Sequence, residues 1–293
     1  MPQTDDPLRG ITLSLAATTV FAASDTTAKF LTASMPVVEI AWIRYVIFVV
    51  FAAYLARTPD PHTLWPRSVW LQVMRGLCIV GSAVLFVFGI RSMQIAQASV
   101  ISFISPVLIT VLSIPLLGEV VGVRRWGATA AGLLGVVIVA RPGTSGFQPA
   151  ALFGVASSAC WALGLVITRK MAGTERPAVT LLWTSVVGTL VLSLGLPLVF
   201  VWPAPWQWGL TLCIGILAST GQWMVVLAHR LAPASVLAPF SYSQLIWATL
   251  AGWLVFDTLP DAWTLVGAAV IIASGLYTWH RERVRAREGT HGG

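Results

Sequence analysis

Charged side chains make up only 10% of this sequence, and a few of them stand inside long apolar runs. Asp25 and Lys29 lie one helical turn apart in the first run, and Ser14 and Thr18 fall on the same helical face. A charge inside hydrocarbon costs about 2.5–3.5 kcal/mol on insertion scales, so an ionisable residue there is a functional candidate. The spacing predicts a polar face that looks into the interior of a helical assembly.

Two interpretations of these charges stay open. In the first, Asp25 and Lys29 form a gate or a contact for a zwitterionic solute. In the second, they neutralise each other as a structural ion pair that braces the first two runs, together with Glu39 and Arg44. Because Asp25 is the only carboxylate well inside a run, any coupling of solute movement to protons would depend on it.

Arg75 lies about two turns inside the third apolar run. An arginine near the end of a run can extend along apolar surface to reach lipid phosphate, or it can contact a helix end. A carboxylate-binding role is the alternative. The predicted gating or coupling residues are therefore Asp25, Lys29, Arg44 and Arg75.

Two runs at corresponding positions in the halves of the chain are interrupted by proline and rich in hydroxyl groups, at Pro106 and Pro239. A break in a helix frees backbone carbonyls that can face a cavity, so such a pair indicates a binding site near the middle of a membrane. The alternative is that serine and proline only permit tight helix packing. Interior tryptophans could add an aromatic wall. The predicted substrate-binding residues are Ser102, Ser105, Pro106, Trp161, Gln222, Trp223, Tyr242, Gln244 and Trp247.

The elements that must position these residues follow from composition. Of 293 residues 57% are apolar, and the mean hydropathy is +0.82, whereas a soluble domain carries roughly 25% charged residues. One membrane span takes about 20 apolar residues. The sequence predicts an all-α membrane protein with spans at 10–31, 37–56, 68–90, 95–117, 125–141, 150–170, 178–201, 207–228, 233–256 and 262–280.

Basic residues set the expected orientation, because they are retained on the cytoplasmic side of short loops. With the N-terminus inside, only Lys29, Arg91 and Arg141 fall on the outer side. Most of the 18 Lys and Arg fall on the inner side: Arg9, Arg57, Arg67, Arg124, Arg125, Arg169, Lys170, Arg176, Arg230, Arg281, Arg283, Arg285 and Arg287. We therefore expect both termini to be cytoplasmic.

The two halves of the chain repeat each other. Ala98-Ser99-Val100 recurs as Ala234-Ser235-Val236, Glu119 and Asp257 close the same two spans, and paired glycines recur between the fifth and tenth spans. Each half holds five spans, and an odd number inverts the second copy. The expected organisation is a first five-helix repeat at 7–141, a second at 147–280 and a basic cytoplasmic tail at 281–293.

These features resemble the EamA group of the drug/metabolite transporter superfamily. The resemblance rests on the half-repeats, the segment 232–248 (APASVLAPFSYSQLIWA), the acidic residues that close spans four and nine, and the charges at Asp25, Lys29, Arg44 and Arg75-Gly76. It implies spans one to four and six to nine around a central cavity, with spans five and ten outside, where Gly127, Ala131 and Gly135 offer a homodimer contact. Relatives of this kind move amino acids, riboflavin, S-adenosylmethionine and other metabolites.

The sequence favours a secondary transporter in a bacterial inner membrane that works by alternating access, and no enzyme. Export of an aromatic or neutral amino acid is the first expectation for its cargo. Import of riboflavin, S-adenosylmethionine or a similar metabolite is the alternative. A membrane scaffold or intramembrane enzyme is the rival class. The four histidines and three cysteines show no metal or catalytic spacing, and no phosphate-binding loop is present, so we expect no cofactor and no nucleic-acid partner.

Overall fold

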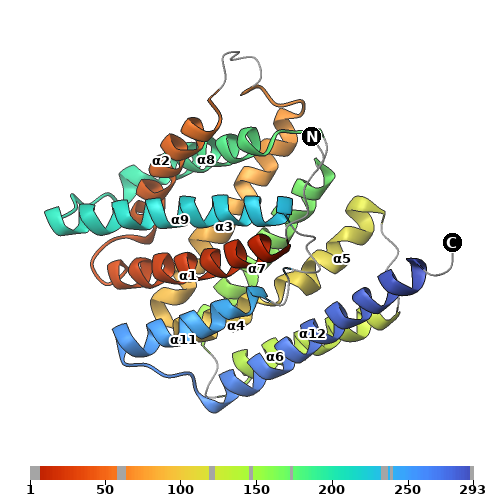
Figure 1. The fold of residues 1–293 in the computed structure, drawn as a ribbon. Helices are drawn as coiled ribbons and strands as arrows, with labels where there is room; N and C mark the ends of the chain where they lie inside the picture. Colours follow the sequence, from red (N-terminus) through yellow and green to blue (C-terminus); the bar gives the residue numbers. More distant parts are fainter. Residues whose placement is uncertain are drawn as a thin grey trace.

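The structure is a computed structural model that describes residues 7–57, 64–118, 123–144, 148–171, 174–231, 237 and 240–290. In these residues all regular structure is helical (Figure 1). The helices are α1 (Pro7–Leu31), α2 (Val37–Leu55), α3 (Val69–Ser92), α4 (Ile95–Ser102), α5 (Ser105–Leu117), α6 (Val123–Ala140), α7 (Ala150–Lys170), α8 (Pro177–Gly195), α9 (Pro205–Leu231), α11 (Ser243–Phe256) and α12 (Ala262–Thr290), with a 3₁₀ turn η2 (Leu196–Leu198) after α8.

Proline and glycine punctuate these helices where the sequence placed the ends of the apolar runs. Pro177 and Pro205 stand at the first positions of α8 and α9, where a missing N–H costs nothing. Gly118 ends α5 with a φ of 70°, a left-handed conformation that glycine adopts without strain. The helices therefore begin and end within a few residues of most predicted spans.

Two differences from the predicted spans have clear causes. The run 95–117 forms two helices, because the chain turns at Phe103 and Ile104, just before Pro106. Helix α12 continues to Thr290, through most of the segment expected as a separate basic tail. Arginine and glutamate are good helix formers, and this stretch holds no proline and no glycine before Gly289.

Helix length and composition fit a membrane-embedded chain. Within the described residues six helical segments are long and apolar enough to cross a membrane: Val37–Leu55, Val69–Ser92, Ile95–Leu117, Ala150–Lys170, Pro177–Leu198 and Pro205–Val225. Shorter apolar helices cover Ala130–Ala140, Ser243–Phe256 and Ala262–Tyr277. Large apolar side chains such as Leu194, Leu198 and Leu254 remain exposed on the outside, which suits contact with lipid rather than water.

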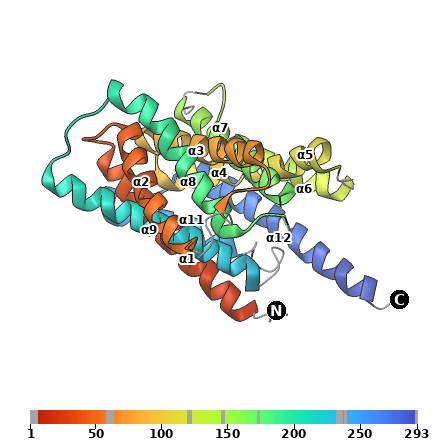
Figure 2. The ribbon, with the colours of Figure 1, turned by 90° about the horizontal axis from the view of Figure 1, so that it is seen from above.

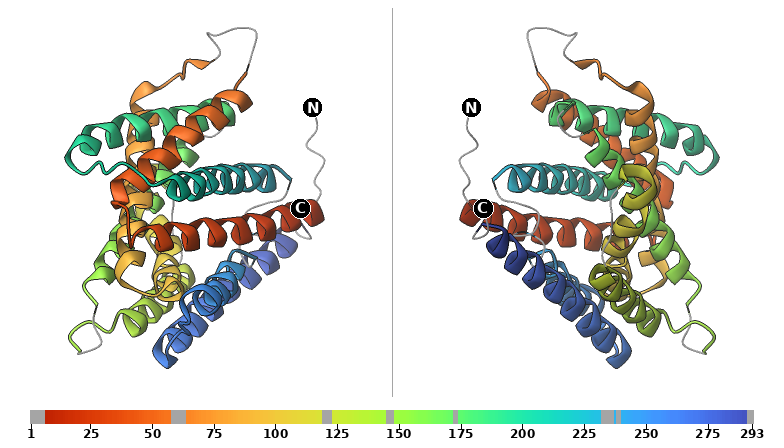
Figure 3. Two further views of the ribbon diagram at one scale, coloured as in Figure 1. Left: turned by 90° about the vertical axis from the view of Figure 1, so that its left-hand side faces the viewer. Right: turned by 90° about the vertical axis from the view of Figure 1, so that its right-hand side faces the viewer.

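Helices from the two halves of the chain pack against each other in pairs. α1 runs beside α9 (Figure 3), α3 beside α7, α2 beside α8, and α6 beside α12 along one edge (Figure 1). Seen from above, the C-terminal end of α12 extends beyond the other helices (Figure 2). The fold is thus held together by contacts that are long-range in sequence.

Glycines permit the closest of these contacts. A Cβ on Gly135 of α6 would stand 2.9 Å from the carbonyl oxygen of Gly267 of α12, and a Cβ on Gly267 would stand 2.6 Å from that of Gly135. Gly127, which the family resemblance places in the same helix-contact motif, meets nothing within 4 Å in the described residues. Gly135 therefore serves the contact between α6 and α12 within one chain.

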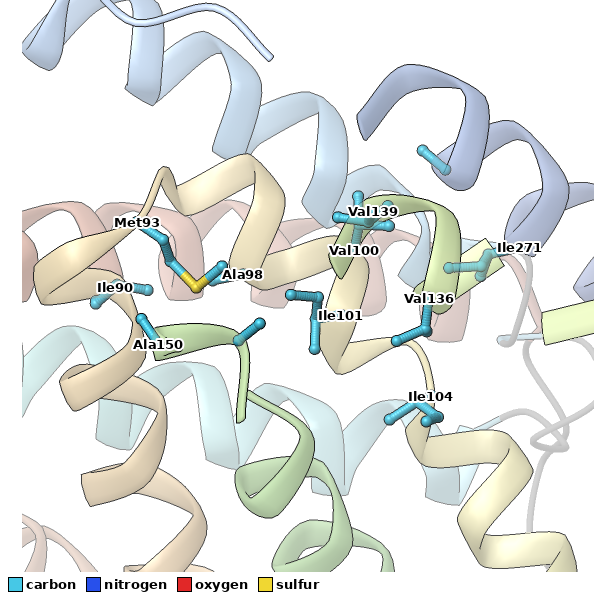
Figure 4. Close-up of a cluster of buried hydrophobic side chains, with 12 residues drawn as sticks. Ile90, Met93, Ala98, Val100, Ile101, Ile104, Val136, Val139, Ala150 and Ile271 are labelled. Atoms are coloured by element: carbon cyan, nitrogen blue, oxygen red, sulfur yellow. The ribbon is translucent and has the colours of Figure 1, made fainter. Parts of the chain in front are cut away.

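The largest apolar cluster lies where α4 meets α6, α7 and α12 (Figure 4). Val100, Ile101 and Val139 are fully buried in it, and Phe103 and Tyr242 pack at its margin. Residues on both sides of the interruption at Phe103, such as Ile101 and Ile104, are therefore buried in the same cluster.

Candidate functional site

The polar face predicted for α1 is directed toward other helices. The Thr18 hydroxyl lies 2.7 Å from that of Ser243 at the start of α11. Farther along α1, the Lys29 ammonium lies 5.0 Å from the centre of the Phe256 ring at the end of α11. Asp25 lies between Thr18 and Lys29 along α1 and is 9% exposed. Three of the four residues on the predicted polar face, Thr18, Asp25 and Lys29, thus lie toward other helices.

Of the two interpretations left open for these charges, the Asp25–Lys29 ion pair is wrong. The Lys29 ammonium donates instead to the Met93 carbonyl oxygen, 2.6 Å away, at the C-terminal end of α3. The last carbonyls of a helix lack intrahelical partners and carry the negative end of its dipole, so they attract a cation. Among the described residues Asp25 makes no hydrogen bond and no ion pair, and it lies within electrostatic range of Arg44.

Glu39 does not brace α1 against α2 through Arg44 either. Its side chain is fully buried, and its Oε2 accepts the backbone N–H of Val201 at 3.2 Å, while Oε1 has no hydrogen-bond partner in the described residues. Arg44 is half-buried and forms no ion pair or hydrogen bond with a described residue. Asp25 and Arg44 thus form no direct bond with each other.

Arg75 is 5% exposed, so the prediction that it extends to lipid phosphate is wrong. Its Nε donates to the Thr168 hydroxyl of α7 at 2.6 Å, and its Nη1 donates to the hydroxyl of Thr184 and to the carbonyl oxygen of Thr180, both on α8. The two hydroxyls donate back to carbonyls of their own helices, which leaves their lone pairs for the guanidinium. Arg75 therefore ties α3 to α7 and α8 without an acidic partner in the described residues.

Tyr45 is a buried polar residue near two of the predicted charges, and sequence reasoning missed it. It is buried, its ring lies against Gly188 of α8, and its hydroxyl is within electrostatic range of both Arg44 and Arg75. Tyr45 thus adds a buried hydroxyl near Arg44 and Arg75. The signal in the sequence was the position of Tyr45 directly after Arg44, which gains meaning only when α8 is placed against α2.

Gln72 is a second residue that the sequence did not single out. Its amide nitrogen donates to the Thr180 hydroxyl at 3.2 Å, and its Oε1 has no hydrogen-bond partner among the described residues. It precedes Arg75 by one turn on the fully buried face of α3. The junction of α3 with α8 is therefore polar over two turns.

The break in the fourth span carries three predicted site residues. Pro106 has no N–H to donate to the Ser102 carbonyl four positions earlier, and the Ser105 hydroxyl donates to that oxygen instead, at 2.6 Å. The Ser102 hydroxyl bonds to the Ala98 carbonyl at 3.0 Å. The Ser105 hydroxyl thus satisfies the Ser102 carbonyl, which Pro106 leaves without a backbone donor.

We expect Ser105→Ala to lower the free energy of unfolding by about 1–2 kcal/mol, because it leaves a buried carbonyl unsatisfied. Ser102→Ala is the matched control with little effect, because the Ala98 carbonyl remains within a helix. Adding Pro106→Ala to Ser105→Ala should restore stability by supplying an N–H. Thermal unfolding in detergent measures all three, and failure of the double variant to recover would contradict this account of the break.

The break in the fourth span contacts the turn that precedes α11 in the second half of the chain. α11 begins at Ser243, directly after a turn at Tyr242, and the Tyr242 ring lies 5.0 Å from the Phe103 ring at the break after α4. The Tyr242 hydroxyl also lies against Gly275 of α12. Pro239, Ser235 and Glu119 lie outside the described residues. We define the breaks junction as the residues Ser102–Pro106 and Tyr242–Gln244.

The remaining predicted site residues are half-buried on three helices. Trp161 lies on α7, Gln222 and Trp223 on α9, and Gln244 and Trp247 on α11. The indole N–H of Trp247 is buried and has no hydrogen-bond partner in the described part of the chain. The structure therefore leaves a buried donor on the helix that contacts the polar face of α1.

Loops that the sequence places on the same side of the membrane contact each other. At the expected outer end the Arg141 guanidinium pairs with the Asp261 carboxylate at 2.5 Å, and at the inner end Glu175 accepts the backbone N–H groups of Arg67 and Ser68. Asp261 also caps α12 through the N–H and hydroxyl of Thr264. Although burial opposes it, these hydrogen bonds and Arg141 hold the pKa of Asp261 below its usual value.

We expect Asp261→Asn to lower stability at neutral pH by under about 1 kcal/mol, because the carboxylate is 41% exposed and solvent screens it. The folded-state pKa lies below the unfolded value of about 3.9, so this contribution is complete above that value and disappears as the pH falls through the folded pKa. The difference in melting temperature between the variant and the parent should therefore vanish in acid. Asp257→Asn is the control, and a difference that persists at low pH would contradict the prediction.

Among the described residues no group of three His, Cys, Asp or Glu side chains could hold a metal ion. The fold and the site together define a multi-pass helical membrane protein in which polar groups are gathered between helices of the two halves. That class includes the transporters. A family model described as the EamA-like transporter family matches residues 8–141 and again 148–278. The chain belongs to this family, which confirms the resemblance read from the sequence.

Relatives and a solved structure agree with this assignment. A riboflavin transporter of Rhizobium johnstonii is 33% identical over 224 residues, covering 75% of this chain and 73% of that protein. An S-adenosylmethionine uptake transporter of Rickettsia prowazekii is 25% identical over 283 residues, covering 94% of each, and a pseudopaline exporter of Pseudomonas aeruginosa is 26% identical, covering 90% and 94%. A crystal structure with 20% identity superposes with a TM-score of 0.62 over 92% of this chain and 94% of the other, which shows the fold. None of these relatives is named for an amino acid.

Proposed function

We propose that the chain moves a small organic metabolite across a bacterial inner membrane by alternating access. Ten spans form two inverted repeats of five, at 7–141 and 147–280, with both termini in the cytoplasm. The two halves rock against each other around the breaks junction. The observation that carries this proposal is the contact between Phe103 and Tyr242, where the interrupted spans of the two halves meet.

Matching close contacts support the inverted repeats. Gly76 of α3 approaches Val187 of α8, and Gly215 of α9 approaches Ile47 of α2. These two contacts exchange when the halves exchange, because each partner lies about half the chain from its counterpart. The pairing of α1 with α9 and of α3 with α7 exchanges in the same way.

Two cargo classes are supported by different observations. Export of an aromatic or neutral amino acid is supported by Asp25 and Arg44, which offer opposite charges, and by the tryptophans on α7, α9 and α11. Import of riboflavin or S-adenosylmethionine is supported by the names of the relatives. A homodimer through α6 and α12 stays part of the proposal, with Gly127 rather than Gly135 available for it.

Transport by purified protein in liposomes tests the proposal. Counterflow of labelled tryptophan, S-adenosylmethionine and riboflavin is measured with vesicles that contain the unlabelled solute inside. We expect accumulation of at least one of them above protein-free vesicles. If no solute of the panel or of a wider metabolite extract accumulates, a scaffold role replaces the transporter.

A further inference from the structure

The first turns of α2 and α8 lie at opposite ends of one helix pair. The two helices run side by side (Figure 1), and they are antiparallel, because Val38 near the start of α2 lies beside Gly195 at the end of α8. The Tyr45 ring, two turns farther along α2, lies against Gly188. α2 and α8 are the second helices of the two proposed repeats. Side chains at their first turns can therefore act on opposite sides of the membrane.

At the start of α2 an acid and an indole bond to the second half of the chain. Glu39 is fully buried, and its Oε2 accepts the backbone N–H of Val201, in the connection to α9, at 3.2 Å. The indole N–H of Trp42 donates to the Ser193 hydroxyl of α8 at 2.8 Å. We call these two contacts the outer latch, because the proposed orientation places them on the outer side of the membrane.

At the start of α8 an acid and an indole bond to the first half of the chain. Glu175, two residues before α8, accepts the backbone N–H groups of Arg67 and Ser68 at 2.8 and 3.2 Å, just before α3. The indole N–H of Trp183 donates to the Leu64 carbonyl oxygen at 3.1 Å. We call these contacts the inner latch. In both latches the acid holds the connection that precedes the third span of the other half.

An apolar cluster at each end repeats the same correspondence. Leu31 at the end of α1 and Ile214 of α9 are buried in one cluster, and Trp42 of the outer latch packs against it. Met171, directly after α7, and Cys78 of α3 are buried in the other. Ile214 and Cys78 are each the tenth residue of their helix, and positions 31 and 171 differ by 140, which is the spacing of the repeat. The two ends of the bundle are therefore closed by equivalent parts of the two halves.

We infer that the outer and inner latches are the gates of the transporter and that they open alternately. Each latch joins one half of the chain to the other, so a movement of the halves that admits a solute from one side must break the latch on that side. Weakening one latch then favours the state that is open on its side. The inference rests on the proposed transport function and its orientation, and it names the residues that control access to the breaks junction.

Variants that weaken one latch at a time test the inference. Gln244→Cys, in a chain whose native cysteines are replaced, reports access to the breaks junction through its reaction with a membrane-impermeant thiol reagent. The measured quantity is the labelling rate in right-side-out vesicles divided by that in inverted vesicles. We expect Glu39→Ala to raise this ratio and Glu175→Ala to lower it, each by about tenfold, the size expected when a hydrogen bond to a charged group is lost. Trp42→Phe and Trp183→Phe should shift it in the same two directions by about threefold, because each removes a neutral hydrogen bond.

Controls separate a gate from a general loss of structure. Asp257→Asn and Trp253→Phe alter exposed side chains elsewhere and should leave the ratio unchanged. Thermal unfolding identifies any alanine variant that does not fold, and the phenylalanine variants then carry the test. Ser193→Ala removes the Trp42 contact from its other partner and should act as Trp42→Phe does.

The outcomes for the gates and for transport are distinguishable. A shift in the same direction for both latches, or no shift beyond that of the controls, would overturn the inference. If the wild-type protein shows counterflow and the latch variants keep its labelling ratio, the latches are not gates while the transport function stands. If the wild-type protein shows no counterflow and position 244 reacts from one side alone, the proposed function itself fails.

Discussion

Replacing Gly135 by valine is expected to lower the free energy of unfolding by about 3 kcal/mol or to prevent folding. The Gly135 backbone lies against the Gly267 carbonyl and the Ile271 side chain, so any side chain pushes α6 away from α12. Overpacking a rigid contact usually costs about 1–3 kcal/mol, and clashes with backbone lie at the upper end because backbone cannot change rotamer. Thermal unfolding in detergent and the yield of monodisperse protein measure the effect.

Gly127→Val is the matched control on the same helix. A side chain at Gly127 meets nothing within 4 Å in the described residues, so the folded chain should tolerate it. If Gly127→Val is stable but changes the oligomeric state, the outer face of α6 is a protomer contact. Equal tolerance of valine at both positions would contradict the close packing of α6 on α12.

The second large effect concerns the buried guanidinium of Arg75. Replacing both Thr168 and Thr184 by valine removes its hydroxyl acceptors while keeping side-chain shape, and it leaves a charge without adequate partners. Removing the partner of a buried charge costs about 3–5 kcal/mol of stability. We expect the double variant to lose about 3 kcal/mol and several degrees of melting temperature.

Adding Arg75→Met should restore most of that stability. The charge is then gone, and each threonine hydroxyl was already donating within its own helix, so no donor is orphaned when Arg75 alone is replaced. Arg75→Met by itself should thus be close to neutral in stability. Thr189→Val, which removes only a back-bonded hydroxyl on α8, is the control. A triple variant no more stable than the double one would contradict the role given to Arg75.

The helices were predictable from the sequence because long apolar runs with Pro and Gly at their ends leave few alternatives in a membrane. The break near Pro106 followed from the same reasoning, since a proline removes one backbone donor. The continuation of α12 was missed because composition identifies a basic segment without deciding between coil and helix. The membrane class and the family could therefore be inferred without a structure.

The partners of the charges could not be predicted. Local spacing suggested that Lys29 pairs with Asp25, but the carbonyl of Met93, 64 positions away, competes better. Arg75 is buried rather than interfacial because threonines on two other helices accept from it, and those contacts depend on how α3 meets α7 and α8. The Tyr45 ring packs where Gly188 of α8 lacks a side chain. Sequence patterns identify which polar groups lie inside, whereas tertiary packing decides what they bind.

Access to the breaks junction from the two sides of the membrane tests the account most directly. Cys78, Cys160 and Cys213 are replaced, single cysteines are introduced at Ser102 or Gln244, and a membrane-impermeant thiol reagent is applied to right-side-out and inverted vesicles. Fully buried Ile101→Cys is the control. The account predicts that both test positions react from either side and that a transported solute slows the reaction. Reaction from one side alone under all conditions, or no more reaction than at position 101, would contradict alternating access around this junction.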